Sequence, residues 1–409
     1  MKTQLKNKIV TVVFATLIMV SFFACIFKPV TEYSSSERKN LADFPKLTLQ
    51  SILNKSFQND FKTYVSDQFP LRDGFRTVKA IFQYYVLGFK ENNGLVVEDG
   101  YVAKVDNTTD YNSIKNAVDK FSTIYTNHLA GTGAKVYLSI VPDKNYFISK
   151  ENGYPSLDYE SIVSMMQSGL SGMTYIDLFG VLELEDYYKT DTHWSQDKLC
   201  NAVNALMGGL GAADRLCGNY TVKKLSPFYG IYYGQSALPL PGETLSYLTN
   251  DVLNECVVYE YKYSLLSKMP EVGQAGHVYS TGVVNGKEVV YDTWQVATPI
   301  YREDLFAESN KSKDPYNVFM GGASALPLLR IHNPNATTEK TLILFRDSFG
   351  SSIAPLMAEG YSDVILVDLR YASYQSLVDV FPYALEPSEN TDVLFLYSTL
   401  ILNSSYSFQ

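Results

Sequence analysis

Cysteine and histidine are scarce in this sequence of 409 residues, which contains four of each. The cysteines are scattered without a Cys-x-x-Cys pair, and this excludes the usual zinc cluster and the thioredoxin-type redox site. Basic residues are outnumbered as well, with 34 Lys and Arg against 43 Asp and Glu, for a formal net charge of −9. Because a nucleic-acid groove normally needs a basic stripe, we expect no nucleic-acid partner. We also expect neither a metal nor another cofactor.

The rest of the composition is typical of a folded protein. Hydrophobic residues make up 46% of the chain and charged residues 19%, which argues against disorder. The length allows one large domain or two ordinary ones. Tyrosine is unusually frequent, with 32 residues against 22 phenylalanines. For Cys200 and Cys217, a disulfide in an exported domain and two buried free thiols both remain open.

An apolar run lies close to the N-terminus. As a helix, residues 9–27 would span about 28 Å, roughly the hydrocarbon core of a bilayer. Lysines precede the run, which predicts a cytoplasmic tail at 1–8, a transmembrane signal anchor at 9–27 and an extracytoplasmic main domain. A cleaved signal peptide and a lipoprotein signal at Cys25 are the alternatives. The run is long for a signal peptide and no clean cleavage site follows, while Phe22 and Phe23 make a poor lipoprotein site.

The charge balance changes when this segment is set aside. Residues 1–28 contain four lysines and no acidic residue, so the remainder has 30 basic and 43 acidic residues, a net charge of −13. An exported domain with this charge is not expected to bind an anionic lipid surface.

The remaining sequence predicts an α/β protein. Residues 28–75 are polar and mixed, as in a stalk, and 76–409 form the main domain. Four apolar strands alternate with helices, and we expect these strands at 135–141, 341–345, 364–367 and 393–397. The helices are expected at 111–130, 159–169, 351–358 and 374–380. This alternation predicts a parallel sheet with helices on both faces. At about 220–335 the pattern breaks, and we expect a mainly β insertion with a hairpin at Asn285-Gly286.

Two short motifs have the residue types of acyl-transfer chemistry. Ser348 follows a parallel-type strand at a strand-to-helix turn, where ligands gather in open α/β sheets. A serine hydroxyl needs a base, usually a histidine whose other nitrogen is held by a carboxylate. In an extended segment Asp191 and His193 point to the same side. These residues predict a triad of Ser348, His193 and Asp191, although a helix-capping serine and a structural Asp–His pair are the common alternatives.

The motifs together resemble the DHHW family and its relatives, the alginate O-acetyltransferases of the AlgX and AlgJ type, within the SGNH-hydrolase-like superfamily. The matching stretches cover almost the whole exported chain: Glu37-Arg38-x-x-Leu41-x-x-Phe44-Pro45, Tyr64-x-x-Asp67-x-Phe69-Pro70-x-Arg72, Val141-Pro142-x-Lys144, Thr190-Asp191-Thr192-His193-Trp194, Phe228-Tyr229-Gly230, Arg346-Asp347-Ser348-Phe349-Gly350 and Val367-Asp368-Leu369-Arg370-Tyr371. The Asp/His motif precedes the Ser motif, which is similar to the circularly permuted order of the alginate branch. Thr192 stands where the family name has its first histidine, but the triad residues are kept.

The resemblance implies a three-layer SGNH-hydrolase-like fold and an extracytoplasmic O-acyltransferase, in particular an O-acetyltransferase, acting on a polysaccharide or other glycan. Ser348 would carry the acetyl group, His193 would act as base and Asp191 would orient His193. The acetyl donor would come from a multipass membrane acyltransferase. A carbohydrate esterase with the same triad is the first alternative. A silent glycan-binding or scaffold protein of an envelope complex is the second.

Several neighbours of the motifs are further candidates. The backbone N–H groups of Ser348 and Phe349 are candidates for the oxyanion hole. Five side chains are candidate substrate contacts, each with a structural alternative: Trp194, Arg346, Lys144, Tyr229 and Tyr232. Tyrosine rings can cover sugar faces while their hydroxyls stay in water. The other three histidines have no expected role.

Overall fold

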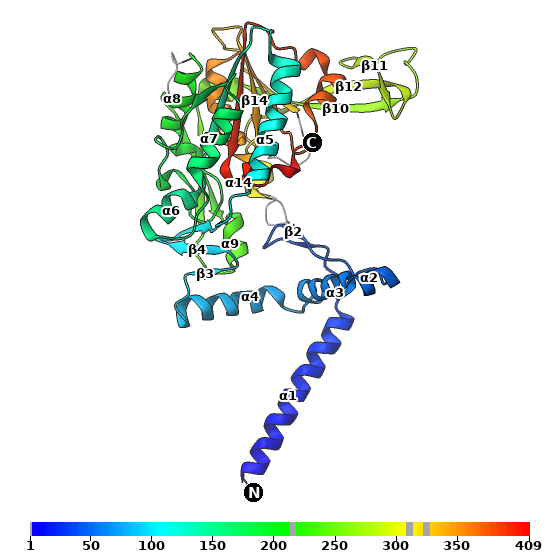
Figure 1. The fold of residues 1–409 in the computed structure, drawn as a ribbon, viewed down its shortest axis with the longest axis vertical. Coiled ribbons are helices and arrows are strands. Elements are labelled where there is room, and N and C mark those ends of the chain that lie inside the picture. Colours follow the sequence, from blue (N-terminus) through cyan, green and yellow to red (C-terminus); the bar gives the residue numbers. More distant parts are fainter. Residues whose placement is uncertain (1, 213–217, 308–313, 322–327) are drawn as a thin grey trace.

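The computed structural model describes residues 2–212, 218–307, 314–321 and 328–409. Helix α1 (Lys2–Phe27) projects away from the rest of the chain (Figure 1). Its stretch Gln4–Phe27 is long and apolar enough to cross a membrane, and none of it is buried by protein. The expected apolar helix is therefore present, and a membrane anchor or a signal sequence would both account for it.

A layer of short helices follows α1 and separates it from the body of the molecule (Figure 1). It consists of the ribbon β1 (Tyr33–Ser34) and β2 (Lys39–Asn40) and the helices α2 (Leu49–Leu53), α3 (Ser56–Asp67) and α4 (Arg72–Ile81). A π-helical turn, η1 (Phe82–Val86), continues α4. The small sheet β3 (Glu91–Asn92), β4 (Leu95–Glu98) and β5 (Tyr101–Lys104) then leads into the body.

A nine-stranded mixed sheet forms the centre of the body, in the order β11-β12-β10-β13-β15-β14-β16-β6-β7. Five strands are parallel: β15 (Asp363–Val367), β14 (Thr341–Arg346), β16 (Thr391–Ser398), β6 (Lys135–Val141) and β7 (Thr174–Ile176). Four antiparallel strands extend the sheet: β13 (Leu328–His332), β10 (Val257–Leu266), β12 (Lys287–Pro299) and β11 (Val278–Val284). The region predicted as an insertion thus supplies strands of the central sheet, and β8 (Thr221–Phe228) and β9 (Glu243–Thr249) pair beside it.

Helices cover both faces of the sheet, as the alternating pattern predicts. Successive residues of a strand point to opposite faces, so Leu342 and Leu344 pack with α8 (Cys200–Gly209) and α12 (Ser348–Met357). Ile343 and Phe345 face the other way and pack with α5 (Tyr111–Ile124), α7 (Tyr159–Gly169) and α13 (Tyr374–Val380). The three-layer α/β fold is therefore confirmed.

Turn chemistry explains the local boundaries. Asn285 and Gly286 both have positive φ, as a two-residue hairpin turn between β11 and β12 requires. Helix α12 begins at Ser348, three residues before the predicted start, because the Asp347 side chain accepts a hydrogen bond from Phe349 N–H and caps the helix. Ser348 thus lies in the first turn of a helix instead of in a loop.

The Phe345–Phe395 pair provides a test of this core. The two rings are fully buried and stack with centroids 4.3 Å apart on the two central parallel strands. Phe395→Ala should lower the free energy of unfolding by about 3–5 kcal/mol, because it leaves a cavity in the core. Urea titration checks this, with the exposed Val283→Ala as control. Equal midpoints for the two variants would contradict this account of the core.

Candidate active site

Ser348 lies at the carboxyl edge of the sheet, directly after β14, and is half-buried. The preceding carboxylate of Asp347 fixes this turn, since Oδ1 accepts from Phe349 N–H (2.9 Å) and Oδ2 accepts from Ser398 N–H (2.8 Å) at the end of the neighbouring strand β16. Gly350 is required here, because a Cβ at this position would lie 2.5 Å from Arg346 Cβ. The Asp-Ser-Phe-Gly sequence therefore holds the Ser348 hydroxyl at a defined position.

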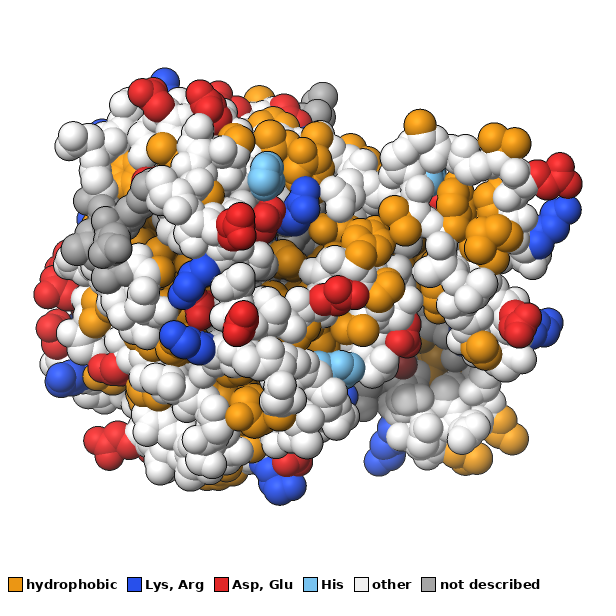
Figure 2. Space-filling model, turned by 90° about the horizontal axis from the view of Figure 1, so that it is seen from above, with side chains coloured by type: hydrophobic (Ala, Val, Ile, Leu, Met, Phe, Trp, Pro, Cys, Tyr) orange, Lys and Arg blue, Asp and Glu red, His pale blue; other side chains and the backbone are white. Residues whose placement is uncertain are grey.

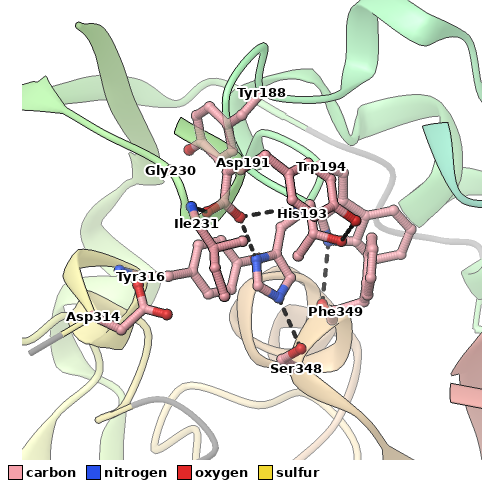
Figure 3. A network of polar contacts seen from close by, with 12 residues as sticks. Tyr188, Asp191, His193, Trp194, Gly230, Ile231, Asp314, Tyr316, Ser348 and Phe349 are labelled. Atoms are coloured by element: carbon pink, nitrogen blue, oxygen red, sulfur yellow. Dashed lines mark hydrogen bonds and ion pairs between the residues drawn. The ribbon is translucent and has the colours of Figure 1, made fainter. Parts of the chain in front are cut away.

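The structure brings the three residues of the predicted triad together (Figure 3). His193 Nε2 lies 2.7 Å from Ser348 Oγ, and His193 Nδ1 lies 2.5 Å from Asp191 Oδ1. An ionised carboxylate only accepts hydrogen bonds, so Nδ1 carries the proton and Nε2 is left to accept from the Ser348 hydroxyl. This is the arrangement in which a histidine can remove the proton from an attacking serine.

The carboxylate of Asp191 is fully buried, yet it is well satisfied. Its Oδ1 also accepts from the backbone N–H of His193 (3.1 Å), and its Oδ2 accepts from Ile231 N–H (2.8 Å). Burial alone would raise its pKa, but the charge and hydrogen bond of His193 and the charge of Arg38, whose Nη1 lies 3.9 Å away, hold the pKa below its usual value. Asp191 therefore stays ionised when the site is in use.

Arg38 connects the N-terminal layer to this carboxylate. Its Nη1 donates to Asp314 Oδ1 (2.8 Å) and its Nη2 donates to the carbonyl oxygen of Tyr229 (2.7 Å). Because a guanidinium presents its donors in a fixed fork, these two bonds set the distance of its charge from Asp191. Sequence reasoning did not assign Arg38 a role. Its place in the Glu37-Arg38 motif was the signal available.

The His193 ring is clamped between aromatic side chains. Tyr316 stacks on it with ring centroids 3.8 Å apart and planes 8° apart, and Phe349 packs on it at 5.0 Å. Tyr316 is itself fixed, because its hydroxyl donates to Ser352 Oγ (2.7 Å) and its backbone N–H donates to Asp314 Oδ1 (2.9 Å). Neither Tyr316 nor Asp314 was a candidate site residue, because both lie in the stretch at about 220–335 whose sequence pattern is irregular.

Two predicted substrate contacts belong to the core. Trp194 is fully buried, and its indole N–H lies within hydrogen-bond distance of the Phe349 carbonyl oxygen (3.1 Å) and Ser352 Oγ (2.8 Å). Arg346 is also buried and pairs with the buried Asp368 at 3.3 Å. A sugar cannot reach either side chain, so these two predictions are wrong. Trp194 instead fastens the histidine segment to the helix that carries Ser348.

Lys144 and Tyr232 are buried as well, and their predicted substrate contacts are also wrong. Lys144 Nζ donates to the carbonyl oxygens of Tyr188 (2.9 Å) and Lys189 (3.1 Å), just before Asp191, and lies 5.0 Å from the centre of the Tyr232 ring. The Tyr232 hydroxyl donates to Thr192 Oγ1 (3.0 Å). Both side chains therefore support the segment that carries Asp191 and His193.

Of the two oxyanion-hole candidates and Tyr229, one is contradicted by the structure and two are not. The N–H of Phe349 is engaged by Asp347, so its predicted place in the oxyanion hole is wrong. The N–H of Ser348 has no acceptor among the residues that the structure describes, and it stays a candidate. Tyr229 is 41% exposed and packs on Tyr233 with centroids 4.6 Å apart. It is still a candidate for contact with a sugar.

Metal-ligating groups do not gather in the part of the chain that the structure describes. No cluster of three or more His, Cys, Asp or Glu is found there. His277 and His332 each pair with a single carboxylate, of Asp292 (2.6 Å) and Asp363 (3.0 Å) respectively. Cys200 is in a disulfide bond, and Cys217, for which a disulfide and a free thiol were both left open, lies outside the described residues.

Arg38→Gln should slow the reaction of Ser348 with phenylmethanesulfonyl fluoride about tenfold, which corresponds to an activation free energy higher by about 1.4 kcal/mol. The cause is a less well-placed Asp191. The acid side of the pH–rate profile should also move to higher pH, because Asp191 holds a proton more easily without the nearby charge. Mass spectrometry of the Ser348 peptide gives the rate. Arg330→Gln, on β13, is the matched control, and equal rates in the two variants would contradict the role of Arg38.

The buried amino group of Lys144 should make the free energy of unfolding depend on pH. Burial lowers its pKa from 10.5 to about 7, although Asp191, Glu243 and Asp143 oppose the shift. Between about pH 7 and pH 10 the unfolded chain thus binds more protons than the folded chain, so the contribution of Lys144 to stability rises with pH across this window. Unfolding titrations at several pH values should show wild type gaining stability relative to Lys144→Met. If the free energies of unfolding of the two proteins changed with pH in parallel, the lowered pKa of Lys144 would be contradicted.

Comparison with known proteins places the fold. No protein-family model matches the sequence, and no curated protein matches it significantly. Among solved structures, a DHHW family protein from Eubacterium siraeum matches with a TM-score of 0.54 and 17% identity, covering 76% of this chain and 93% of that one. Bacillus cereus PatB1, solved with a sulfonyl adduct, matches with a TM-score of 0.52 and 18% identity, covering 75% and 97%.

A third solved structure, the O-acetyltransferase domain of Pseudomonas putida AlgJ, is less similar, with a TM-score of 0.41 and 12% identity, covering 76% of this chain and 95% of that one. The first two matches cover about three quarters of this chain and nearly the full length of their own chains, so the similarity is not confined to the sheet. The resemblance expected from the motifs is thus confirmed at the level of the fold. The chain therefore has an α/β fold similar to that of a DHHW family protein and of PatB1.

Proposed function

We propose that this chain is a serine-dependent O-acyltransferase that moves an acetyl group onto a hydroxyl of a cell-envelope or secreted polysaccharide. The observation that carries the proposal is the connected series Ser348–His193–Asp191, with separations of 2.7 and 2.5 Å. A buried Asp191 and an aromatic clamp on His193 fit a site whose geometry is set before the substrate arrives. The motif resemblance suggests acetyl as the group and a glycan as the acceptor.

The proposed reaction has two halves. Ser348 Oγ attacks the carbonyl carbon of an acetyl donor while His193 Nε2 takes the hydroxyl proton, and the protonated His193 then gives that proton to the leaving group. In the second half His193 takes the proton of a sugar hydroxyl, whose oxygen attacks the acetyl-Ser348 ester. Collapse of this second intermediate restores the Ser348 hydroxyl, which recovers its proton from His193. The Ser348 N–H is a candidate donor to the oxyanion in both halves.

The proposed location is the outer side of a membrane, with α1 as the anchor and 1–8 in the cytoplasm. Lysines on the N-terminal flank and an apolar helix of spanning length support this orientation. A donor supplied by a multipass membrane acyltransferase would suit a site held near the bilayer. Water in place of the sugar in the second half would make the same triad an esterase, and a scaffold role would require no turnover.

The test uses the purified full chain in detergent with 4-nitrophenyl acetate as donor and a panel of oligosaccharides as acceptors. We expect acetyl-Ser348 by mass spectrometry and acetylated sugar as product. Ser348→Ala should reduce turnover by about 10⁴-fold or more, since no other group in the site can form the ester. His193→Ala should cause a loss of the same order.

Ser351→Ala is the matched control, because Ser351 lies on the same helix and its buried hydroxyl has no hydrogen-bond partner among the described residues. It should keep near wild-type turnover. Acetate release with no acetylated sugar would identify an esterase. Equal background rates in wild type and Ser348→Ala, with no acyl-serine, would overturn the proposal and leave the scaffold role.

A further inference from the structure

An apolar stripe runs along α4 and η1 on the side turned away from the body. Its side chains recur at helical spacing, and each is more than half exposed: Leu71, Phe75, Val78, Phe82, Tyr85, Val86 and Phe89. Large apolar side chains in this number normally mark a surface that another phase or molecule covers. On the opposite end of the body, apolar groups are interspersed with charges of both signs (Figure 2).

The opposite side of the same helix is fixed to the body. Arg76 Nη2 donates to the carbonyl oxygens of Gly234 (3.0 Å) and Gln235 (3.0 Å), and it pairs with Glu37 at 3.4 Å. Ala80 is fully buried in the cluster that includes residues of β4 and β5, and Tyr84 packs against it. Since α4 cannot turn about its axis without losing these contacts, the apolar stripe faces permanently outward.

The outward side is also the side from which α1 leaves. Lys28, one residue beyond α1, donates to the Gln68 carbonyl oxygen (3.4 Å), and the Gln68 side chain exchanges hydrogen bonds with the backbone of Thr31 (3.0 and 2.8 Å). Gln68 directly follows α3, four residues before α4 begins. Figure 1 shows α4 lying crosswise to α1, with the body on its far side. A helix placed in this way lies parallel to the surface of any membrane that α1 crosses.

The charge of the chain is divided along the same line. Residues 28–90 contain ten basic and six acidic residues, whereas residues 91–409 contain 21 basic and 37 acidic residues. The segment nearest the anchor is therefore cationic, although the exported part as a whole is strongly acidic. Basic residues close to an apolar stripe favour contact with anionic headgroups.

We propose that α4 and η1 lie in the outer headgroup region of the bilayer, with the apolar stripe inserted among the lipids. The occupant of this surface is lipid, because the stripe faces the side from which α1 leaves and lies in a segment with a net positive charge. The body then stands on two supports, α1 through the membrane and α4 along it. This inference rests on α1 being a membrane span, as in the proposed function, and does not depend on the catalytic step.

The test places a tryptophan on the stripe of the full chain. Tyr85→Trp is reconstituted in vesicles of phosphatidylcholine and phosphatidylglycerol whose acyl chains are brominated near the headgroup. The fluorescence of the added tryptophan should fall by about half or more, since an interfacial helix is buried about 5–10 Å into the headgroup boundary. Tyr406→Trp is the matched control, because Tyr406 is about as exposed as Tyr85 but lies near the C-terminus of the body. It should not be quenched.

Two outcomes would overturn the proposal, and they are distinguishable. An unquenched Tyr85→Trp in a chain that alkaline carbonate cannot extract would reject the lipid contact alone, and is the result expected if another protein covers the stripe. Extraction of the wild-type chain by alkaline carbonate would reject the anchor together with the contact. Neither outcome alters the expected acetyl-Ser348, which is measured in detergent.

Discussion

The buried carboxylate of Asp191 is the constraint on which the site depends. A charge with no exposed surface must be compensated by partners, or it neutralises. Here the partners come from four places in the sequence: the His193 segment, Ile231 at the start of α9 (Ile231–Ser236), Arg38 of the N-terminal layer and, through Arg38, Asp314. The two carboxylate oxygens of Asp191 therefore hold together segments that are not paired with one another as strands.

The sheet supplies the second half of the arrangement. Parallel strands end at the same edge, and the turn after β14 is tied to the end of β16 through Asp347. Buried polar side chains around this edge are engaged in holding loops, as Lys144 and Trp194 illustrate. Few side chains around Ser348 are therefore exposed, and Tyr229 is the one candidate sugar contact that is not buried.

Local signals made much of this predictable. The strand at 135–141 and the helices at 159–169 and 374–380 have the predicted bounds, because their apolar periodicity and capping residues are contained in the segment itself. The Asp-x-His and Asp-Ser-Phe motifs are likewise local patterns, and they were sufficient to select Asp191, His193 and Ser348 as candidates. Arg38 and Tyr316 could not be found in this way, since their partners lie far away in the sequence. Arg346 was misjudged because its burial depends on Asp368, which belongs to another strand end.

Because Arg38 is close to α1, the position of a proteolytic cut after α1 decides whether the released domain contains Arg38. Arg38 lies only eleven residues beyond the end of α1, yet it reaches the carboxylate of Asp191. A protease that cuts shortly after α1 would shed a soluble domain that still holds its arginine. A cut a few residues later, beyond Arg38, would shed a domain that keeps Ser348 and His193 but lacks the counter-charge of Asp191. The position of the cut in this short linker would thus decide whether the released domain keeps or loses the charge beside Asp191.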